Sequence, residues 1–483
     1  MNCSSTLSLP QEMEDDRWLP KFGVEDIWKM LSEIRSNSAG SDDIPTLLYK
    51  RSSLILADPI YHLIVESIRQ RRFPNTWKIS DVVPIPKLRN SSIHDARPIS
   101  LLPKPAKIAE KIILKDLRPQ FSRLLGDLQF GIRKGSSTTH AIIAAHDSLT
   151  KHFDNPDIGA IIFLSFDFTK AFDKVMHDKL LLKAQGKNLP TGFIYFLKNY
   201  LEDRFQRVRY RGCRSLLKSV TSGVPQGSLL GPYLFGLYAS SLSPCFPLTC
   251  MIKYVDDVCL SFGVKKSNST ADIDALKLEI ENVSQWAAEN DLTLNMQKTN
   301  GFVKYRGNFQ EQCAIETLFP RINFSDCVKF LGIFLDSSFG WESHVSYVEK
   351  KCAQRIYILR RMKSFTSDEQ FKTIYSALIR SLIEYACPAF IGISRDESKR
   401  LQKIQDRCLK IKGDISMTEL EIRRRSMAVK IFKGLPGQET FISQLTPSWL
   451  PSGRISVPFC RTARRRNAFL PHMCISESST FSE

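Results

Sequence analysis

The chain has 483 residues, enough for two to four domains of roughly 100–200 residues each. Hydrophobic residues make up 43% of it, which excludes a disordered or low-complexity protein. The 68 Lys and Arg residues outnumber the 50 Asp and Glu residues, and the resulting net charge of +18 favours a polyanionic partner such as nucleic acid. A generically basic soluble protein is the alternative.

Twelve cysteines are scattered along the chain without a CxxC pair, a pattern typical of reduced thiols inside cells. No signal peptide is expected, because no basic segment followed by an apolar one opens the sequence. The uncharged run 219–252 contains four prolines, which favours a buried core segment over a membrane span. We therefore expect a soluble intracellular protein, nuclear or cytoplasmic.

The first half of the chain alternates helical and strand-like patterns. Apolar residues recur at helical spacing over 24–36 and again over 105–118. Between them, residues 82–87 predict a short edge strand, because prolines interrupt the β-branched run. From 161 to 184 the pattern changes from a buried strand that ends at Asp167 to a helix.

Beyond about residue 340 the apolar spacing is helical throughout. Two capping boxes are predicted there, Thr366 with Glu369 and Ser394 with Glu397, because a hydroxyl residue precedes Glu by three positions. The last 70 or so residues are basic and end in a Ser-rich tail.

Residues 251–260 predict a β-hairpin in which Asp256 and Asp257 stand side by side. The plain interpretation is a hairpin tip, since Asp is a favoured turn residue. However, Asp167 also ends a buried strand, which is costly for a carboxylate unless it is paired or binds a metal. If strand and hairpin are neighbours, three carboxylates meet, and Mg²⁺ would offset their repulsion. Two such ions can activate a 3′-hydroxyl for nucleotidyl transfer.

Three motifs carry a family resemblance: "YVDD" at 254–257, "FDFTKAFDKVMHDKLL" at 166–181 and "SGVPQGSLLGPYLF" at 222–235. They resemble the core motifs of reverse transcriptases, in the wording of non-LTR (jockey-like, LINE-type) retrotransposons. Further matching motifs cover roughly residues 22–410 in the family's order. The resemblance implies an α+β right-hand polymerase that extends a DNA primer with dNTPs on an RNA template, without a membrane.

The resemblance also implies a catalytic triad of Asp167, Asp256 and Asp257. Asp167 and Asp256 would be the main ligands of two Mg²⁺ ions, for which Mn²⁺ is a possible substitute. The backbone carbonyl of Phe168 would assist them, and Asp257 would be the weaker third partner.

Five residues match the family's nucleotide-binding positions: Lys87, Arg97, Phe172, Gln226 and Lys298. Lys87 and Arg97 would grip the triphosphate, and Gln226 would touch the incoming nucleotide. Phe172 would exclude a ribose 2′-hydroxyl, although spacing alone favours a core aromatic. Lys298 would donate a proton to pyrophosphate, with a surface lysine as the alternative.

By the same resemblance, the chain divides into five parts, with "FLGIFLD" at 330–336 as the primer grip. They are an N-terminal helical extension (1–50), fingers (51–155), palm (156–336), helical thumb (337–412) and a basic C-terminal extension (413–483).

The sequence departs from the family pattern at Ala96, where an aromatic residue is usual. We also expect no endonuclease domain before residue 22 and neither a Cys/His knuckle nor an RNase H-like domain after the polymerase. One alternative is therefore an inactive nucleic-acid-binding relic of such an element. Another is a viral RNA-dependent RNA polymerase, against which "YVDD" and the bulky Phe172 count.

Overall fold

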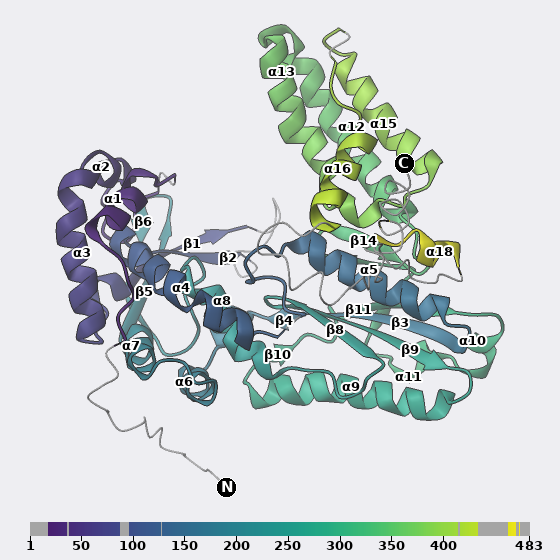
Figure 1. Ribbon diagram of the computed structural model, residues 1–483, viewed down its shortest axis with the longest axis horizontal. Helices are drawn as coiled ribbons and strands as arrows, with labels where there is room; N and C mark the ends of the chain where they lie inside the picture. Colours follow the sequence, from purple (N-terminus) through teal and green to yellow (C-terminus); the bar gives the residue numbers. More distant parts are fainter. Residues whose placement is uncertain are drawn as a thin grey trace, which may run out of the picture. The chain divides into compact units, whose positions relative to one another are not determined.

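The computed structural model of the chain describes residues 18–35, 38–86, 96–126, 128–413, 416–432, 462–469 and 473 (Figure 1). Its elements form two compact units, each assembled from separate stretches of chain. The first unit comprises Met1–Gly126, Thr169–Leu242 and Gln285–Thr293, and the second comprises Asp127–Phe168, Ser243–Ser284 and Leu294–Glu483. Both mix helices with sheets, which confirms the predicted α+β class.

The first unit is built on a five-stranded sheet ordered β2-β1-β5-β6, with β7 paired to β5. Its strands are β1 (Ile79–Ile85), β2 (Arg97–Leu101), β5 (Arg204–Tyr210), β6 (Cys213–Arg214) and β7 (Lys218–Val220). Its helices are α1 (Val24–Ser32), α2 (Thr46–Arg51), α3 (Ser53–Arg69), α4 (Lys104–Leu124), α6 (His177–Gly186), α7 (Thr191–Leu201) and α8 (Leu230–Tyr238). Helices α1 and α4 confirm the helices predicted from apolar spacing.

Strand β1 confirms the predicted strand at 82–87, but its predicted edge position is wrong. It lies inside the sheet, antiparallel to β2 and parallel to β5. The proline argument fails because β5 pairs only with Ile79–Val82, so that ladder has ended before Pro84. On the other side Pro84 faces Pro98, and neither needs a backbone donor there.

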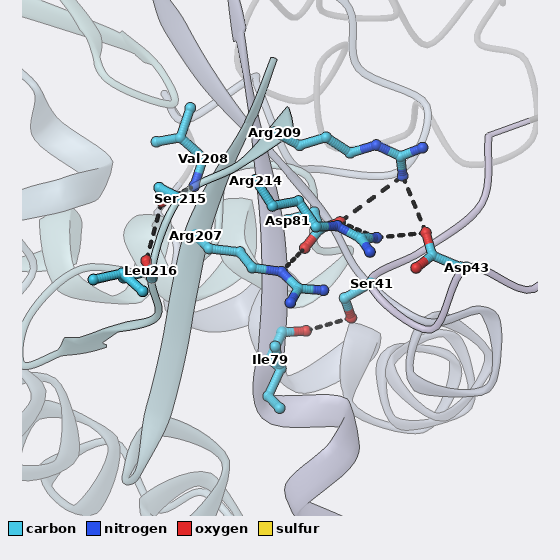
Figure 2. A network of polar contacts seen from close by, with 10 residues as sticks. All are labelled: Ser41, Asp43, Ile79, Asp81, Arg207, Val208, Arg209, Arg214, Ser215 and Leu216. Atoms are coloured by element: carbon cyan, nitrogen blue, oxygen red, sulfur yellow. Dashed lines mark hydrogen bonds and ion pairs between the residues drawn. The ribbon is translucent and has the colours of Figure 1, made fainter. Parts of the chain in front are cut away.

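A buried carboxylate ties the strands of this sheet together (Figure 2). Asp81 on β1 is 0% exposed and accepts hydrogen bonds from Arg207 Nε at 2.7 Å and from Arg214 Nη2 at 2.7 Å. Arg214 also pairs with Asp43, as does Arg209 at 3.5 Å. The two carboxylates raise the pKa of Arg214. These contacts join β1 to β5 and β6, so the charged side chains of a basic hairpin are fixed in place.

The second unit contains a five-stranded sheet ordered β12-β11-β3-β9-β8 and a two-stranded sheet of β13 and β14. Its longer strands are β3 (Ile158–Phe166), β8 (Thr249–Tyr254), β9 (Asp257–Lys265) and β11 (Asn300–Tyr305). Its shorter strands are β12 (Asn323–Phe324), β13 (Cys327–Phe330) and β14 (Ile333–Asp336). Two further short strands, β4 (Phe168–Thr169) and β10 (Thr293–Leu294), each contribute one residue to this unit.

Helices α5 (Thr138–Asp154) and α9 (Ser269–Glu289) cover opposite faces of the larger sheet in this unit (Figure 1). On one face, Ser148 of α5 hydrogen-bonds Ser261 of β9 at 2.6 Å. On the other face, Thr249 of β8 donates to Glu279 of α9 at 2.9 Å. Thr249 pairs with Phe262, the neighbour of Ser261, and side chains alternate between faces along a strand. The sheet is therefore buried on both sides.

The remainder of the second unit is largely helical from residue 342, as predicted. Among the described residues these helices are α12 (Glu342–Met362), α13 (Asp368–Tyr375), α14 (Ser381–Glu384), α15 (Arg395–Leu409), α16 (Leu420–Phe432) and α18 (Ala463–Arg466). Two short helices, α10 (Phe309–Gln312) and α11 (Ile315–Leu318), precede them. A π-helical turn, Ser376–Arg380, joins α13 to α14. One apolar core runs from the sheet into these helices.

The capping box of Ser394 and Glu397 is confirmed at the start of α15. The box predicted for Thr366 and Glu369 is wrong. The cap of α13 is Ser367, which accepts from the Gln370 N–H, and the Gln370 side chain accepts from the Ser367 N–H. The Thr366 hydroxyl instead donates to the Met362 carbonyl at 2.9 Å, so it ends the preceding helix.

A short segment of the basic C-terminal region docks on α5. Arg465 forms an ion pair with Asp147, and both side chains are at most 5% exposed. Arg465 Nη1 also donates to Thr150 Oγ1 at 3.2 Å, and the Thr462 N–H donates to Asp154 at 2.6 Å. Through Arg465, Ala468 and Phe469, which are buried, this segment contributes to the second unit's core.

Two findings concern the predicted environment of the chain. In the part that the structure describes, no helix combines the length and the apolar composition needed to cross a membrane. All nine described cysteines are free thiols, as their spacing predicts.

The core histidine His344 makes folding stability depend on pH. It is 3% exposed among Trp341, Tyr347 and Phe390, and neither ring nitrogen has a hydrogen-bond partner. Burial lowers the pKa of His344 to about 4. The unfolded chain therefore binds a proton near the ordinary value of 6.5, whereas the folded chain does not, and the free energy of unfolding falls as pH drops through this window.

The free energy of unfolding should fall between about pH 7 and about pH 5, and we expect this fall to be roughly 1–3 kcal/mol smaller in His344→Phe. Urea unfolding of both proteins at the two pH values measures this difference. His62→Phe is the matched control, because the His62 side chain is 69% exposed. An unchanged pH dependence in His344→Phe would contradict the assignment.

Candidate active site

The three predicted catalytic carboxylates come from adjacent strands of the second unit's sheet. Tyr254 pairs with Asp257, so β8 and β9 form a hairpin whose two turn residues are Val255 and Asp256. Strand β3 lies on the other side of β9, and its last pair joins Phe166 to Val258. The next residue of β3's chain is Asp167. The register therefore brings Asp167 level with Asp257, at the end of the sheet where the hairpin turns.

These carboxylates remain accessible from solvent. Asp257 is exposed, while Asp167 and Asp256 are partly buried. Phe168, whose carbonyl is the predicted assisting ligand, directly follows Asp167 and has a buried side chain. The predicted hairpin tip is confirmed in outline, except that Asp257 already belongs to β9 and Val255 takes the first turn position.

The hairpin turn has a strained backbone at Val255, whose φ is 59°. This left-handed region is unfavourable for a β-branched residue and costs about 1–3 kcal/mol. Positive φ at the first turn position and not at the second is the pattern of a type II′ turn, where Gly is usual. The surrounding structure must hold Asp256 in this turn.

Gln129 and Gly131 supply that support. Gln129 is 1% exposed, and its side-chain oxygen accepts from the N–H groups of Val255 at 2.9 Å and Gly131 at 3.1 Å. The backbone of this segment also bonds to Lys253 on both sides, through Leu128 and Phe130 at 2.9 Å. A Cβ on Gly131 would lie 2.4 Å from Val255 Cγ2 and 2.7 Å from its nitrogen, so only Gly fits.

A second loop supports Asp167 from the side. The Asn295 N–H donates to the Asp167 carbonyl at 2.8 Å, and the following turn brings the Lys298 N–H to the Asn295 carbonyl at 3.1 Å. Lys298 itself is exposed. Lys298 therefore lies three residues along the chain from Asn295, which contacts Asp167 directly.

Three of the predicted nucleotide-binding residues lie together in the first unit. The Gln226 carbonyl accepts from the Ser100 N–H at 2.6 Å, which places the "SGVPQGS" loop against β2. Gly227 has a φ of 123°, and a Cβ there would lie 2.6 Å from the Ser100 carbonyl oxygen. Arg97 opens the same strand and is exposed. Lys87 lies outside the described residues.

Phe172 belongs to the same cluster. Its ring stacks on Phe235 with centroids 5.0 Å apart and an interplanar angle of 21°, and its carbonyl accepts from the Val224 N–H at 2.9 Å. The side chain is only partly buried, so one part of the ring packs in the core and the rest is accessible. Both interpretations of Phe172, core aromatic and gate, are compatible with this position.

Two acidic residues that sequence reasoning missed hold the Gln226 loop. The Gln226 amide donates to Asp173 Oδ1 at 2.9 Å, and burial raises the pKa of Asp173. Glu110 is 0% exposed and accepts from the Leu229 N–H at 2.6 Å and the Tyr200 hydroxyl at 2.7 Å, while its burial raises its pKa. The sequence feature that could have predicted a buried acid is Glu110 itself, because it stands among the apolar positions of the helix predicted over 105–118.

The support of the Asp256 turn by Gln129 can be tested without an activity assay. We expect Gln129→Ala to remove the acceptor of the Val255 N–H and to speed hydrogen exchange in a peptide covering 251–260 by roughly 10-fold or more. Exchange followed by mass spectrometry measures this rate. Gln297→Ala, which changes an exposed glutamine, is the control, and equal exchange in both variants would contradict the role of Gln129.

Comparisons with known proteins identify the family. The chain matches the family model described as reverse transcriptase (RNA-dependent DNA polymerase) over residues 85–335. It is 29% identical to the probable RNA-directed DNA polymerase from transposon BS of Drosophila melanogaster, over 80% of this chain and 44% of the relative. It is 24% identical to the RNA-directed DNA polymerase from mobile element jockey of Drosophila funebris, over 81% of this chain and 44% of the relative.

The chain spans less than half the length of these relatives. Among solved structures, it is similar to a telomerase from Candida tropicalis in complex with a fragment of telomeric RNA. That similarity covers 77% of this chain and 64% of the other, at 14% identity and a TM-score of 0.41.

The family match covers just over half of the chain. It contains the β3 strand with Asp167, the hairpin with Asp256 and Asp257, and the loop with Gln226. The chain therefore belongs to the reverse transcriptase family, as its motifs predict.

Proposed function

We propose that this chain is the RNA-directed DNA polymerase of a non-LTR retrotransposon. It would add dNTPs to the 3′-hydroxyl of a DNA primer paired to an RNA template, inside the cell. The observation that carries the proposal is the strand register that sets Asp167 level with Asp257, beside the turn with Asp256. The family match and the names of the relatives support the same activity.

The donor atoms of this site suit a hard divalent cation. Within the described residues, no three His, Cys, Asp or Glu side chains are gathered closely enough to hold a metal ion by themselves. The donors offered at this end of the sheet are nevertheless all oxygens, the ligands that Mg²⁺ and Mn²⁺ prefer. We propose Asp167, Asp256 and the Phe168 carbonyl as ligands, with Asp257 as the weaker one. Two ions bound there would stabilise charge on the attacking 3′ oxygen and the leaving pyrophosphate.

The residues of the first unit would recognise the incoming nucleotide. The exposed guanidinium of Arg97 would bind the triphosphate bidentately. Gln226, fixed by Asp173 and β2, would contact the nucleotide from a loop that Gly227 allows to pack closely against Ser100 of β2. Phe172, held by its stack on Phe235, would occupy the space of a ribose 2′-hydroxyl. Lys87 and Lys298 would assist at the phosphates.

The assignment of the chain's parts is also a proposal. Residues 51–155, 156–336 and 337–412 would be fingers, palm and thumb, with the primer grip at 330–336. The strands at that segment, β13 and β14, form a small antiparallel sheet. Such a sheet would be a rigid platform for the end of a primer. The helices that follow present many Lys and Arg side chains, which suit contacts with the phosphates of a duplex.

The first test is primer extension by the purified chain with an RNA template, a DNA primer, dNTPs and Mg²⁺. We expect Asp256→Asn to lower the extension rate by on the order of 100- to 1,000-fold or more, because a metal ligand is lost. Template–primer affinity should stay nearly unchanged. Asp178→Asn is the control, since Asp178 is an exposed carboxylate on α6.

Equal loss of extension and of template–primer binding in Asp256→Asn would make that residue structural. No extension by the unmodified chain, with binding intact, would favour the inactive nucleic-acid-binding relic.

The second test concerns sugar selection. We expect Phe172→Ala to raise ribonucleotide incorporation relative to deoxynucleotides by roughly 10- to 200-fold, because the excluded volume is removed. Competition assays that compare rNTP and dNTP incorporation measure the ratio. Phe172→Tyr keeps the ring and should discriminate as the unmodified chain does. Unchanged discrimination in Phe172→Ala would leave Phe172 as a core aromatic only.

A further inference from the structure

A polar cavity of about 390 Å³ lies at the start of α15, within the second unit and away from the carboxylates described above. Its lining comes from three segments: the residues that lead into α15, one face of α16, and the docked C-terminal segment. Three arginines, Arg395, Arg424 and Arg425, line it against one carboxylate, that of Glu421. The charge of the lining is therefore positive.

Arg424 is the unusual member of this lining. It is 4% exposed, and its Nη2 donates to Ser398 Oγ at 2.9 Å, but its Nε has no hydrogen-bond partner. Among the described residues, no carboxylate forms an ion pair with it, and burial lowers its pKa. A buried guanidinium without a countercharge is costly, because its hydration has been lost without replacement.

The neighbouring arginine on α16 shows the contrast. Arg423 forms an ion pair with Glu384, and that carboxylate raises the pKa of Arg423. The same helix thus offers one guanidinium that forms an ion pair and one, Arg424, that forms none among the described residues and feels the Glu421 carboxylate only at a distance. The unmatched group is the one that lines the cavity.

The first turn of α15 adds a second attraction for an anion. The helix has 15 residues, and Ser394, its cap, also lines the cavity. N–H groups of a first turn lack carbonyl partners within the helix and carry the positive end of its dipole. Helix N-termini bind phosphate groups for this reason. Two acids of this first turn, Asp396 and Glu397, offset part of that attraction, and the Glu397 carboxylate is already held by the Ser394 N–H and hydroxyl.

We propose that this cavity binds a phosphate group. Arg395 and Arg425, both exposed, would hold the phosphate oxygens, and the phosphate would supply a countercharge beside the buried guanidinium of Arg424. The phosphodiester of a bound nucleic-acid strand is the source we favour, because exposed arginines at the rim can reach a polymer that does not enter the cavity. This inference uses the nucleic-acid partner proposed above, but it does not depend on catalysis.

The test is a binding measurement with a fluorescein-labelled RNA–DNA hybrid, in the absence of dNTPs and divalent ions. We expect Arg424→Gln and Arg425→Gln each to weaken binding by roughly 3- to 10-fold. Each should also reduce the slope of log affinity against log salt by about 0.7–0.9 if one phosphate contact is lost. Lys430→Gln, an exposed residue of α16, removes the same charge outside the cavity and is the matched control. Equal effects in all three variants would overturn the site.

A second measurement distinguishes the phosphate of a nucleic acid from free inorganic phosphate. Sodium phosphate should raise the thermal midpoint of the unmodified chain more than sodium chloride of equal ionic strength, and Arg425→Gln should lose this difference. If that occurs while the hybrid binds every variant equally, the nucleic-acid source is overturned in favour of free phosphate. If Arg424→Gln does not fold, the exposed Arg425 still decides the outcome.

The two proposals fail in different ways. A chain that binds the hybrid in an arginine-dependent manner but extends no primer contradicts only the proposed polymerase. A chain that extends primers with unchanged hybrid affinity in both arginine variants contradicts only the phosphate site.

Discussion

The left-handed backbone of Val255 is the constraint on which the arrangement of the carboxylates depends. A valine does not adopt this conformation without support, and the support comes from Gln129 and Gly131, more than a hundred residues earlier. Because the turn is two residues long, its geometry fixes the register of β8 and β9, and β9 in turn sets the position of β3. The place of Asp167 relative to Asp257 follows from that register.

Buried carboxylates in both units are paired with cations or accept hydrogen bonds from distant segments. Asp81 is surrounded by arginines, Asp147 is paired with Arg465, and Glu110 accepts two hydrogen bonds. Each of these carboxylates joins segments that are distant in sequence, so each fixes an arrangement that apolar contacts alone would leave less specific. Arg424 departs from this pattern, and the departure is what distinguishes the cavity at α15 from an ordinary surface hollow.

Local patterns in the sequence predict local structure well here. Apolar spacing anticipates α1, α4 and the helices beyond residue 340. One failure is non-local and the other is local. The inner position of β1 depends on its pairing with β5, and the Ser367 cap replaces Thr366 because the Thr366 hydroxyl bonds backward to Met362. Gln129 and Glu110 escape notice because each has a partner far along the chain, Val255 for Gln129 at 126 residues and Leu229 for Glu110 at 119 residues.

The ion pair of Arg465 with Asp147 closes a loop of 318 residues, and this has a consequence for biosynthesis. Helix α5 leaves the ribosome long before Arg465, which lies 318 residues after Asp147, and the Asp147 carboxylate then stands on a surface that the finished core covers. Until residue 465 has been translated, that carboxylate has no guanidinium beside it, and the second unit cannot complete its packing. The sheet that carries Asp167, Asp256 and Asp257 therefore reaches its final stability only after residue 465 has been translated, and until then the nascent chain exposes surface that chaperones can bind.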